Sequence, residues 1–209
     1  MSTEPGTAST VTPDVTPEIH VTGNARERLL LAAASVLAER GYGQTRLGEV
    51  AALAGLKPPA IYHYFGSRED MIAEVMRVGQ QRVRAHVEDA VSQIHGCALD
   101  RIDAAVAAHL EIQLELSEFA AAVTRNAGHT PGRVRAALKE ESDAYHETWR
   151  RLIADARASG EMRADLDPTI ARMLVIGALN WAVEWWTKGR PIDALTSSAQ
   201  RLVRQALSS

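Results

Sequence analysis

Three basic side chains within residues 45–70 could bind an anion: Arg46, Lys57 and Arg68. Arg68 follows Ser67, which can cap the start of a helix, so its charge and the helix N-terminus would converge on one phosphate group. A guanidinium can also bind phosphate through two parallel hydrogen bonds. A run of mainly aromatic side chains, residues 61–65, lies directly before this position. The pattern indicates binding to a nucleic acid.

Two short helical patterns joined by a glycine position these side chains. The first pattern has apolar residues at the three- and four-residue spacing of one helical face: Leu47, Val50, Ala51 and Ala54. Gly55 can take the positive φ that ends this helix. Pro58 and Pro59 suit the first turn of the next helix, where amide hydrogens lack partners anyway. The order predicts a helix-turn-helix motif over about residues 46–65.

A longer helix is predicted in front of this pair. Asn24 and Glu27 form the pattern of a capping box, and Gly41 can end the helix. Together the three helices make a small unit over residues 23–83. This unit carries eight Lys or Arg against six Asp or Glu, which gives +2, although the whole chain has a net charge of −3. Positive charge is therefore mildly concentrated where the nucleic acid would bind.

Base edges would be read from the first turn of the second short helix and from the start of the first one. The residues at these two places are Arg46, Leu47, Gly48, Lys57, Pro58, Pro59 and Ala60. The prolines offer no side-chain hydrogen bond, and Ala60 offers only a methyl group for contact with thymine. Direct donors are therefore limited to Lys57 and Arg46. Arg46 would contact a phosphate or a guanine edge, and a solvated surface arginine is the alternative.

The N-terminal pattern resembles the TetR family of transcriptional regulators. The matching residues are Gly41-Tyr42, Thr45, Val50-Ala51, Ala54-Gly55, Ile61-Tyr62-His63-Tyr64-Phe65 and Ser67-Arg68-Glu69. The resemblance implies that Tyr62 holds a phosphate and that His63 and Tyr64 flank the DNA backbone similarly. One of these last two is expected to face inward if Phe65 anchors the core, and Tyr62 packed against Tyr42 and Phe65 is an alternative. The family usually has Lys where this chain has Arg68.

The resemblance implies an all-α, nine-helix fold, with a C-terminal ligand-binding and dimerisation domain over residues 84–209. Proline, glycine and apolar spacing predict helices over about residues 68–94, 100–116, 118–126, 131–158, 168–188 and 191–207. Residues 1–22 are rich in Thr, Ser and Pro, which predicts a disordered tail. The lone Cys97 fits a reducing compartment, and no segment is suited to cross a membrane, so we expect a cytoplasmic protein.

The last two helices are the expected dimer interface. Their apolar stripes include Leu179, Val183, Leu195 and Leu202, and the helix over residues 168–188 is apolar nearly all round. Such a helix needs cover on every side, which one subunit does not obviously supply. Pairing both helices with their symmetry mates gives a homodimer that binds a palindromic operator in double-stranded DNA. An ordinary intramolecular core is the alternative.

A lipophilic ligand is predicted to bind near Trp149, Asn180, Trp181 and Trp185, where aromatic walls meet one polar group. Packing of Trp185 and Trp186 at the dimer edge is the alternative. The segment of residues 133–190 is similar to a TetR subgroup that responds to acyl-CoA thioesters, so the expected effector is an acyl-CoA. Arginines at positions 125, 133, 135, 150 and 151 could then meet the CoA phosphates.

Other functions remain open at this point. A multidrug-responsive repressor of an efflux transporter is one alternative, and a helical enzyme or interaction module is another. The chain shows no metal-protease pair, nucleophile elbow or phosphate-binding glycine loop. A metal could be ligated by His109 with Glu111 and Gln113, or by His129 and His146, only if their helices met suitably. We therefore expect no catalytic residues, cofactor or metal, and we expect a repressor, although the sequence does not separate repression from activation.

Overall fold

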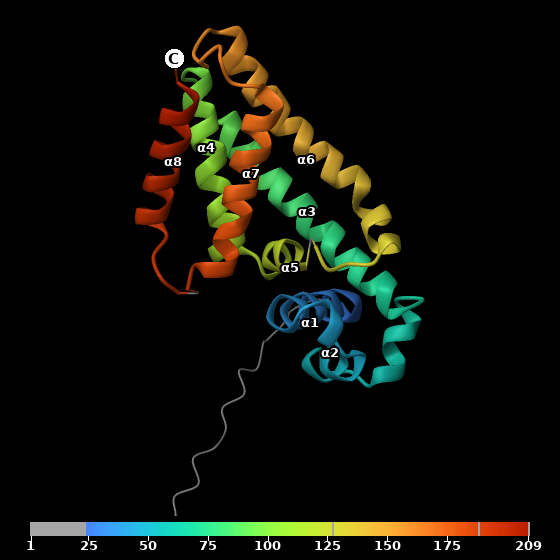
Figure 1. The fold of residues 1–209 in the computed structure, drawn as a ribbon. Helices are drawn as coiled ribbons and strands as arrows, with labels where there is room; N and C mark the ends of the chain where they lie inside the picture. The colour runs from blue at the N-terminus through green and yellow to red at the C-terminus, as the bar shows by residue number, and fades with distance from the viewer. Residues whose placement is uncertain (1–23, 127, 188, 209) are drawn as a thin grey trace, which may run out of the picture.

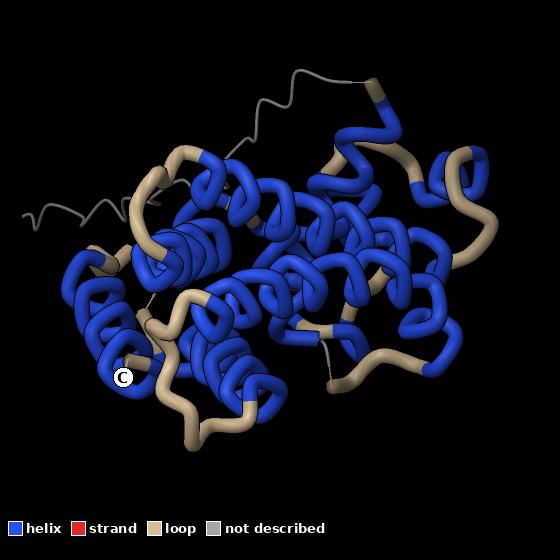
Figure 2. Tube along the Cα trace, turned by 90° about the horizontal axis from the view of Figure 1, so that it is seen from above, coloured by secondary structure: helices blue, strands red, loops and turns tan. Residues whose placement is uncertain are grey.

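The computed structural model describes residues 24–126, 128–187 and 189–208, and these are helical almost throughout (Figures 1 and 2). Within them, the one pairing of extended backbone is an isolated bridge between Met162 and Ser208. The all-α prediction is thus confirmed. The tail predicted for residues 1–22 lies outside the described residues.

The N-terminal unit begins with α1 (Ala25–Arg40) and α2 (Leu47–Leu53), which a short 3-10 turn (Tyr42–Gln44) connects. The expected capping box is present, because the Asn24 side chain accepts from the Glu27 amide at 3.0 Å and the Glu27 carboxylate accepts from the Asn24 amide at 3.1 Å. Gly41 and Gly55 both have positive φ, at 76° and 68°. The two glycine stops predicted from the sequence therefore end α1 and the turn after α2.

The second helix of the motif differs from the prediction, because Pro58–His63 is a 3-10 helix rather than an α-helix. Its bonds run from each amide to the carbonyl three residues earlier, as from Ala60 to Lys57 at 2.9 Å. Pro58 and Pro59 have no amide hydrogen, so they cannot take part in either helical ladder. Ile61 and Phe65 point into the core of the unit, and all three residues at positions 62–64 are exposed. The expectation that His63 or Tyr64 faces inward is therefore wrong.

The remaining helices form the body of the molecule. They are α3 (Arg68–Ser92), α4 (Ala98–Glu111), α5 (Glu118–Asn126), α6 (Gly132–Ala158), α7 (Pro168–Trp185) and α8 (Asp193–Leu207). A π-helical turn, Ile112–Leu116, follows α4, so the single helix expected over residues 100–116 is interrupted. With the segment Pro58–His63 counted as the third helix, the described residues contain the nine helices of the expected order.

Two apolar cores lie along α3, which runs from the N-terminal unit into the body (Figure 1). The first core gathers Leu37, Ile61 and Met71, and the second gathers Ile102 and Trp149. α3 and α5 cross closely at Gly79, where an added Cβ would lie 2.4 Å from the Phe119 carbonyl oxygen. A larger residue at position 79 would push the two helices apart.

The C-terminal end of α5 caps the C-terminal end of α1. The Asn126 side chain accepts from the Tyr42 amide at 2.7 Å and donates to the Leu37 carbonyl at 3.1 Å. The neighbouring Arg125 donates to the Ala38 carbonyl at 2.8 Å. Both carbonyls belong to the last turn of α1, where backbone acceptors run short of helical donors, although Leu37 also accepts from the Gly41 amide. The N-terminal unit is therefore joined to the body through α5 as well as through α3.

α7 is buried on one side only. Its exposed side carries five large apolar residues, namely Ile170, Met173, Leu174, Trp181 and Trp185. Leu179 and Val183 face the opposite way, into the core of their own subunit. Each helix within the described ranges is too short or too polar to cross the hydrocarbon layer of a membrane.

Candidate nucleic-acid interface and ligand cavity

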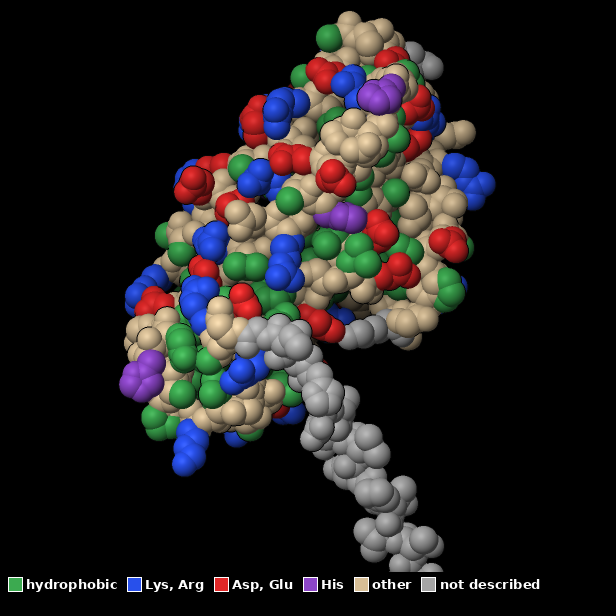
Figure 3. All heavy atoms as spheres, turned by 180° about the vertical axis from the view of Figure 1, so that it is seen from behind, with side chains coloured by type: hydrophobic (Ala, Val, Ile, Leu, Met, Phe, Trp, Pro, Cys, Tyr) green, Lys and Arg blue, Asp and Glu red, His purple; other side chains and the backbone are tan. Residues whose placement is uncertain are grey.

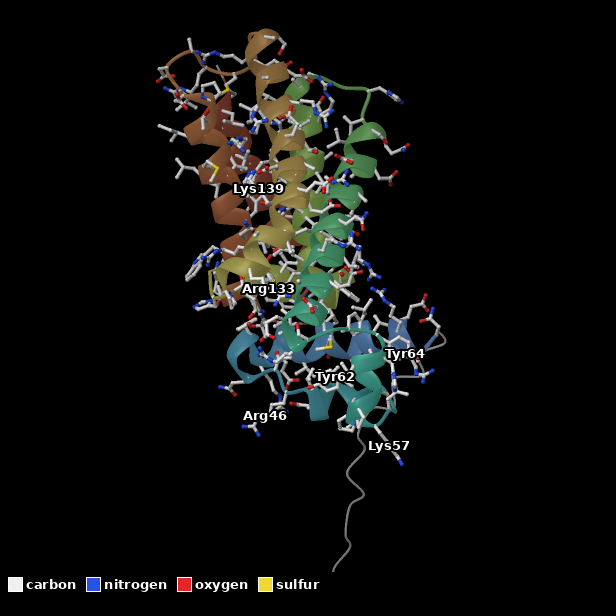
Figure 4. All side chains as sticks on the ribbon, turned by 90° about the vertical axis from the view of Figure 1, so that its right-hand side faces the viewer. Arg46, Lys57, Tyr62, Tyr64, Arg133 and Lys139 are labelled. Carbon is white, nitrogen blue, oxygen red and sulfur yellow. The ribbon has the colours of Figure 1, made fainter. Side chains whose placement is uncertain are left out.

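The predicted DNA-reading residues lie at the free end of the N-terminal unit. Arg46 and Lys57 are exposed, and both project away from the body of the molecule (Figure 4). Tyr62 is 61% exposed and Tyr64 is 42% exposed, from the 3-10 segment and the turn after it. His63 is exposed between them. Hydroxyl, imidazole and cationic groups therefore share one end of the molecule, as contacts to a phosphate backbone require.

The smaller residues of the motif have different surroundings. Pro58 and Pro59 are exposed, and Ala60 is half-buried beside them. A Cβ added at Gly48 would meet nothing within 4 Å, so the backbone there is open to a close approach. Leu47 packs against the core of the unit, which leaves it little freedom to contact a base. Among these positions, Arg46 and Lys57 are the residues with exposed side-chain donors, and their direct contact with bases stays a prediction.

Arg68 differs from its predicted role as a phosphate ligand. Its Nε donates to the Thr45 carbonyl at 2.8 Å, and one terminal nitrogen donates to the Tyr42 carbonyl. The guanidinium also lies over the Tyr42 ring, 4.6 Å from its centre. The guanidinium points into the unit because these two backbone carbonyls, which follow α1, need hydrogen-bond donors. In this structure Arg68 braces the turn between α1 and α2.

Charge is unevenly spread over the surface. In the rear view of Figure 3, Lys and Arg side chains with few acidic neighbours stand at the lower end of the molecule, whereas both signs of charge are interspersed over the upper body. The same lower end holds Arg46 and Lys57 (Figure 4). A cationic end on a chain with a net charge of −3 suits an anionic partner that binds only there.

A cavity of about 220 Å³ lies in the body between α3 and α7. It is lined by Gln80, Val83, His109, Gln113, Val123, Thr124, Ser142, Tyr145, His146, Ile176 and Asn180. Apolar and hydrogen-bonding side chains contribute to the same wall, which is the usual composition of a small-molecule site. We call this space the inner cavity.

Polar side chains in the inner cavity form a connected hydrogen-bond network. The Gln113 side-chain amide donates to Asn180 Oδ1 at 3.1 Å and to His109 Nε2 at 2.8 Å. The Thr124 hydroxyl donates to Gln113 Oε1 at 2.9 Å. Because Nε2 accepts, the His109 proton resides on Nδ1, which bonds the Tyr145 hydroxyl. Four elements of the fold are thus tied together through one glutamine.

Burial keeps this network uncharged. Desolvation lowers the pKa of His109 to about 4, so the imidazole is neutral at physiological pH. Desolvation also raises the pKa of Tyr145, which holds the phenol in its protonated form. The wall therefore offers neutral donors and acceptors and no formal charge from these two groups.

The predicted ligand-binding residues are only partly brought together. Asn180 lines the inner cavity. Trp149 is fully buried, with its ring edge-on to Tyr145 at 6.5 Å between centres, so it lies behind the cavity wall. Trp181 and Trp185 are 64% and 54% exposed and belong to the outer side of α7. The aromatic wall expected around the ligand is therefore replaced by the polar network.

A second, larger cavity of about 420 Å³ lies where α1 meets the body, and we call it the outer cavity. Its lining includes Glu39 of α1, Glu115 and Glu118 near the start of α5, Arg125, and Gln113. Gln113 lines both cavities and is only 5% exposed. Its side chain therefore forms part of the partition between them.

The predicted dimer residues also divide into two sets. Leu179 and Val183 are 4% exposed, so a partner subunit could not reach them, and Leu195 is half-buried against the body core. Leu202 is 73% exposed. The apolar surface open to a partner is therefore Leu202 together with the exposed side of α7.

Comparison with known proteins agrees with this two-part layout. Residues 29–75 match the model for bacterial regulatory proteins of the tetR family, and residues 95–206 match that for the tetracyclin repressor-like C-terminal domain. The second match alone covers more than half of the chain. The chain belongs to the TetR family. It is accordingly a DNA-binding transcriptional regulator, and its N-terminal unit is the part that matches the family's DNA-binding model.

Individual TetR relatives extend the likeness over most of the chain. The transcriptional repressor KstR2 of Rhodococcus jostii is 26% identical over 184 residues, which cover 85% of this chain and 87% of KstR2. The crystal structure of AibR in complex with isovaleryl coenzyme A and operator DNA has a TM-score of 0.76 at 21% identity, covering 88% of this chain and 98% of AibR. The crystal structure of FadR from Bacillus subtilis in complex with stearoyl-CoA has a TM-score of 0.74 at 21% identity, covering 87% of this chain and 98% of FadR. At this identity the two structures show a shared TetR fold.

Apart from Asn180, sequence reasoning missed the residues that line the inner cavity of this TetR protein. His109 and Gln113 stand four residues apart, and this spacing places them on one helical face. That signal was available, and it points to a buried polar pair. The partners on α5, α6 and α7 become visible only once the helices pack.

Proposed function

We propose that this protein is a homodimeric repressor that leaves a palindromic operator when an acyl-CoA-type effector binds in the inner cavity. In this proposal residues 23–83 form the DNA-binding domain, and residues 84–209 bind the ligand and the partner subunit. The inner cavity is the observation that carries the proposal. The repressor name of KstR2 and the CoA thioesters bound by AibR and FadR support it by analogy.

The composition of the inner cavity favours an acyl chain over a cationic drug. Val83, Val123 and Ile176 supply apolar surface for hydrocarbon. Asn180 can offer a hydrogen bond to a thioester or to an oxygen on the chain. Among the described lining residues there is no carboxylate to balance a buried cation. The efflux-repressor alternative therefore has less support from this site.

A basic face of α6 offers a place for the CoA phosphates. Arg135, Lys139, Ser142 and His146 follow one another at spacings of three or four residues, so they share a face of α6. Ser142 and His146 line the inner cavity, and Lys139 lies one turn farther along, 76% exposed and paired with the exposed Asp143 carboxylate, which a phosphate could replace. An acyl group in the cavity would thus leave its charged head beside cations on this helix.

The exposed side of α7 is the proposed dimer interface. Leu174 and Trp181 are 70% and 64% exposed, and with their neighbours they form a continuous apolar face. A face of this kind is costly to leave in water, and a second copy of the same helix covers it symmetrically. Dimerisation sets the spacing between the two DNA-binding units.

Effector binding could reach the DNA-binding unit through α5. Thr124 of α5 bonds Gln113 in the cavity wall, and the next two residues, Arg125 and Asn126, bond the end of α1. A ligand whose chain ends against Gln113 would favour a different placement of Thr124, and hence of α5 and α1. The effector must prefer the conformation with low DNA affinity, since equal binding to both conformations shifts nothing. The protein acts by binding alone in this proposal, in the cytoplasm and without catalysis.

A thermal-shift screen followed by a gel shift on the protein's own promoter tests the proposal. Acyl-CoAs should stabilise the protein and release the DNA, whereas CoA alone, free acids and hydrophobic cations should do neither. At 100 times its dissociation constant a ligand adds about 2.7 kcal/mol to stability. Asn180→Leu should weaken the effect, and Glu140→Ala at an exposed position of α6 serves as the control. Stabilisation by cations but not by acyl-CoAs would favour the efflux alternative.

A further inference from the structure

We infer that Gln113 limits the length of the acyl chain that the inner cavity accepts, by closing it off from the outer cavity. This inference rests on the proposed function, because it concerns the same site. Its basis is that Gln113 lines both cavities and that three neighbours hold its side chain in place.

Three hydrogen bonds hold the Gln113 side chain, which forms the partition, in one orientation. His109, Thr124 and Asn180 bond the amide group from α4, α5 and α7, at 2.8, 2.9 and 3.1 Å. A buried amide that moved away would leave these partners unpaired, so rotation is unfavourable. The π-helical turn in which Gln113 lies places the side chain here, and such turns occur often at functional sites.

The charges around the two cavities orient the ligand. The outer cavity has carboxylates at Glu39, Glu115 and Glu118 and one guanidinium at Arg125. Three carboxylates against one guanidinium disfavour the CoA phosphates there, whereas the α6 face carries two cations, Arg135 and Lys139, of which Lys139 is paired with Asp143. The head group therefore lies toward α6, and the far end of the acyl chain points toward Gln113.

The size of the inner cavity gives the expected limit. A cavity of about 150 Å³ in another protein binds benzene. By this measure, a space of about 220 Å³ has room for roughly nine carbon atoms. A longer chain would have to displace Gln113 and enter the outer cavity, where the carboxylates make the surroundings polar. Wild-type protein should therefore prefer short and medium acyl chains.

Two substitutions separate the partition from the hydrogen bonds. Gln113→Ala removes most of the side chain and joins the two cavities, whereas Gln113→Leu keeps a similar volume and removes the hydrogen bonds. Dissociation constants of the full-length protein for saturated acyl-CoAs from two to eighteen carbons are measured by calorimetry. Gln113→Ser, which also opens the partition, replaces the alanine variant if circular dichroism shows that the latter is unfolded.

Wild type and Gln113→Leu should bind more tightly with each added carbon up to about nine, and then more weakly. Gln113→Ala should continue to gain beyond nine carbons, by up to about fourfold for each methylene that reaches the apolar part of the outer-cavity lining, such as Val183 and Trp186. Equal binding of palmitoyl-CoA by wild type and Gln113→Ala would overturn the role of Gln113 and leave the proposed effector class intact. Absence of binding at every chain length, in wild type and variants alike, would instead overturn the proposed effector class and this inference with it.

Discussion

Asn126→Ala should loosen the connection between the DNA-binding unit and the body. Asn126 is 1% exposed, and its side chain accepts from the Tyr42 amide at 2.7 Å. The Leu37 carbonyl that it also bonds keeps a second donor, since the Gly41 amide lies 3.0 Å away. The Tyr42 amide is thus the group left without its partner. An unsatisfied buried donor costs about 1–3 kcal/mol.

For a chain of this size, that loss corresponds to a fall in melting temperature of roughly 2–12 °C. Urea unfolding followed by circular dichroism measures the free energy directly, and a gel shift measures the effector concentration needed to release DNA. We expect lower stability and a weaker response to the effector, because α5 no longer holds the end of α1. Glu140→Ala at an exposed position of α6 is the control and should change stability by less than about 0.5 kcal/mol. The reasoning would be refuted if Asn126→Ala were as stable as this control.

Four further predictions follow from the same structure. Arg68→Ala should lower the stability by about 1.5–3 kcal/mol, because its hydrogen bonds to two backbone carbonyls are lost. Arg46→Ala should leave the melting temperature unchanged and should reduce the salt slope of operator binding by about one. Leu174→Glu should yield a helical monomer in sedimentation, and a persistent dimer would exclude this face of α7. The pKa of His109 falls from 6.5 to about 4 on folding, so between these pH values only the unfolded chain binds a proton there. The contribution of His109 to stability is therefore fully present above pH 6.5 and is lost below it, by about 1.4 kcal/mol per pH unit. His109→Phe should remove this contribution to the pH dependence of unfolding.

The N-terminal unit was readable from sequence because its signals are local. A capping box at Asn24, a glycine stop at Gly41 and the apolar spacing of α2 each act within a few residues, and each appears in the structure. Exposure of Arg46, Lys57 and Tyr62 follows from the same spacing. The helical character of Pro58–His63 was also predicted, but its 3-10 form was not, since two successive prolines constrain both ladders and sequence periodicity does not distinguish them.

The inner cavity was not readable in this way, because its parts are assembled by tertiary packing. Gln113, Tyr145 and Asn180 are separated by more than thirty residues from one another along the chain. The four tryptophans favoured an aromatic ligand site because they are the largest apolar groups. In the structure, however, Trp181 is exposed on the outer side of α7, and Trp149 lies behind the cavity wall. Arg68 shows that sequence reasoning has the same limit when it predicts the partner of a charged side chain. A cation at a helix start is equally suited to an external phosphate and to the carbonyls at the end of a neighbouring helix.

The polar network explains how one cavity could provide both selectivity and a switch. Without a ligand, Gln113 satisfies His109, Thr124 and Asn180 at once, so the resting conformation leaves few of these groups unpaired. A chain that displaced Gln113 would leave these groups unpaired, so a chain that ends against the amide binds better. Such a chain contacts the side chain that holds Thr124, and its packing there can change the favoured position of α5. The free energy that selects the effector is thus also the free energy available to move the DNA-binding unit.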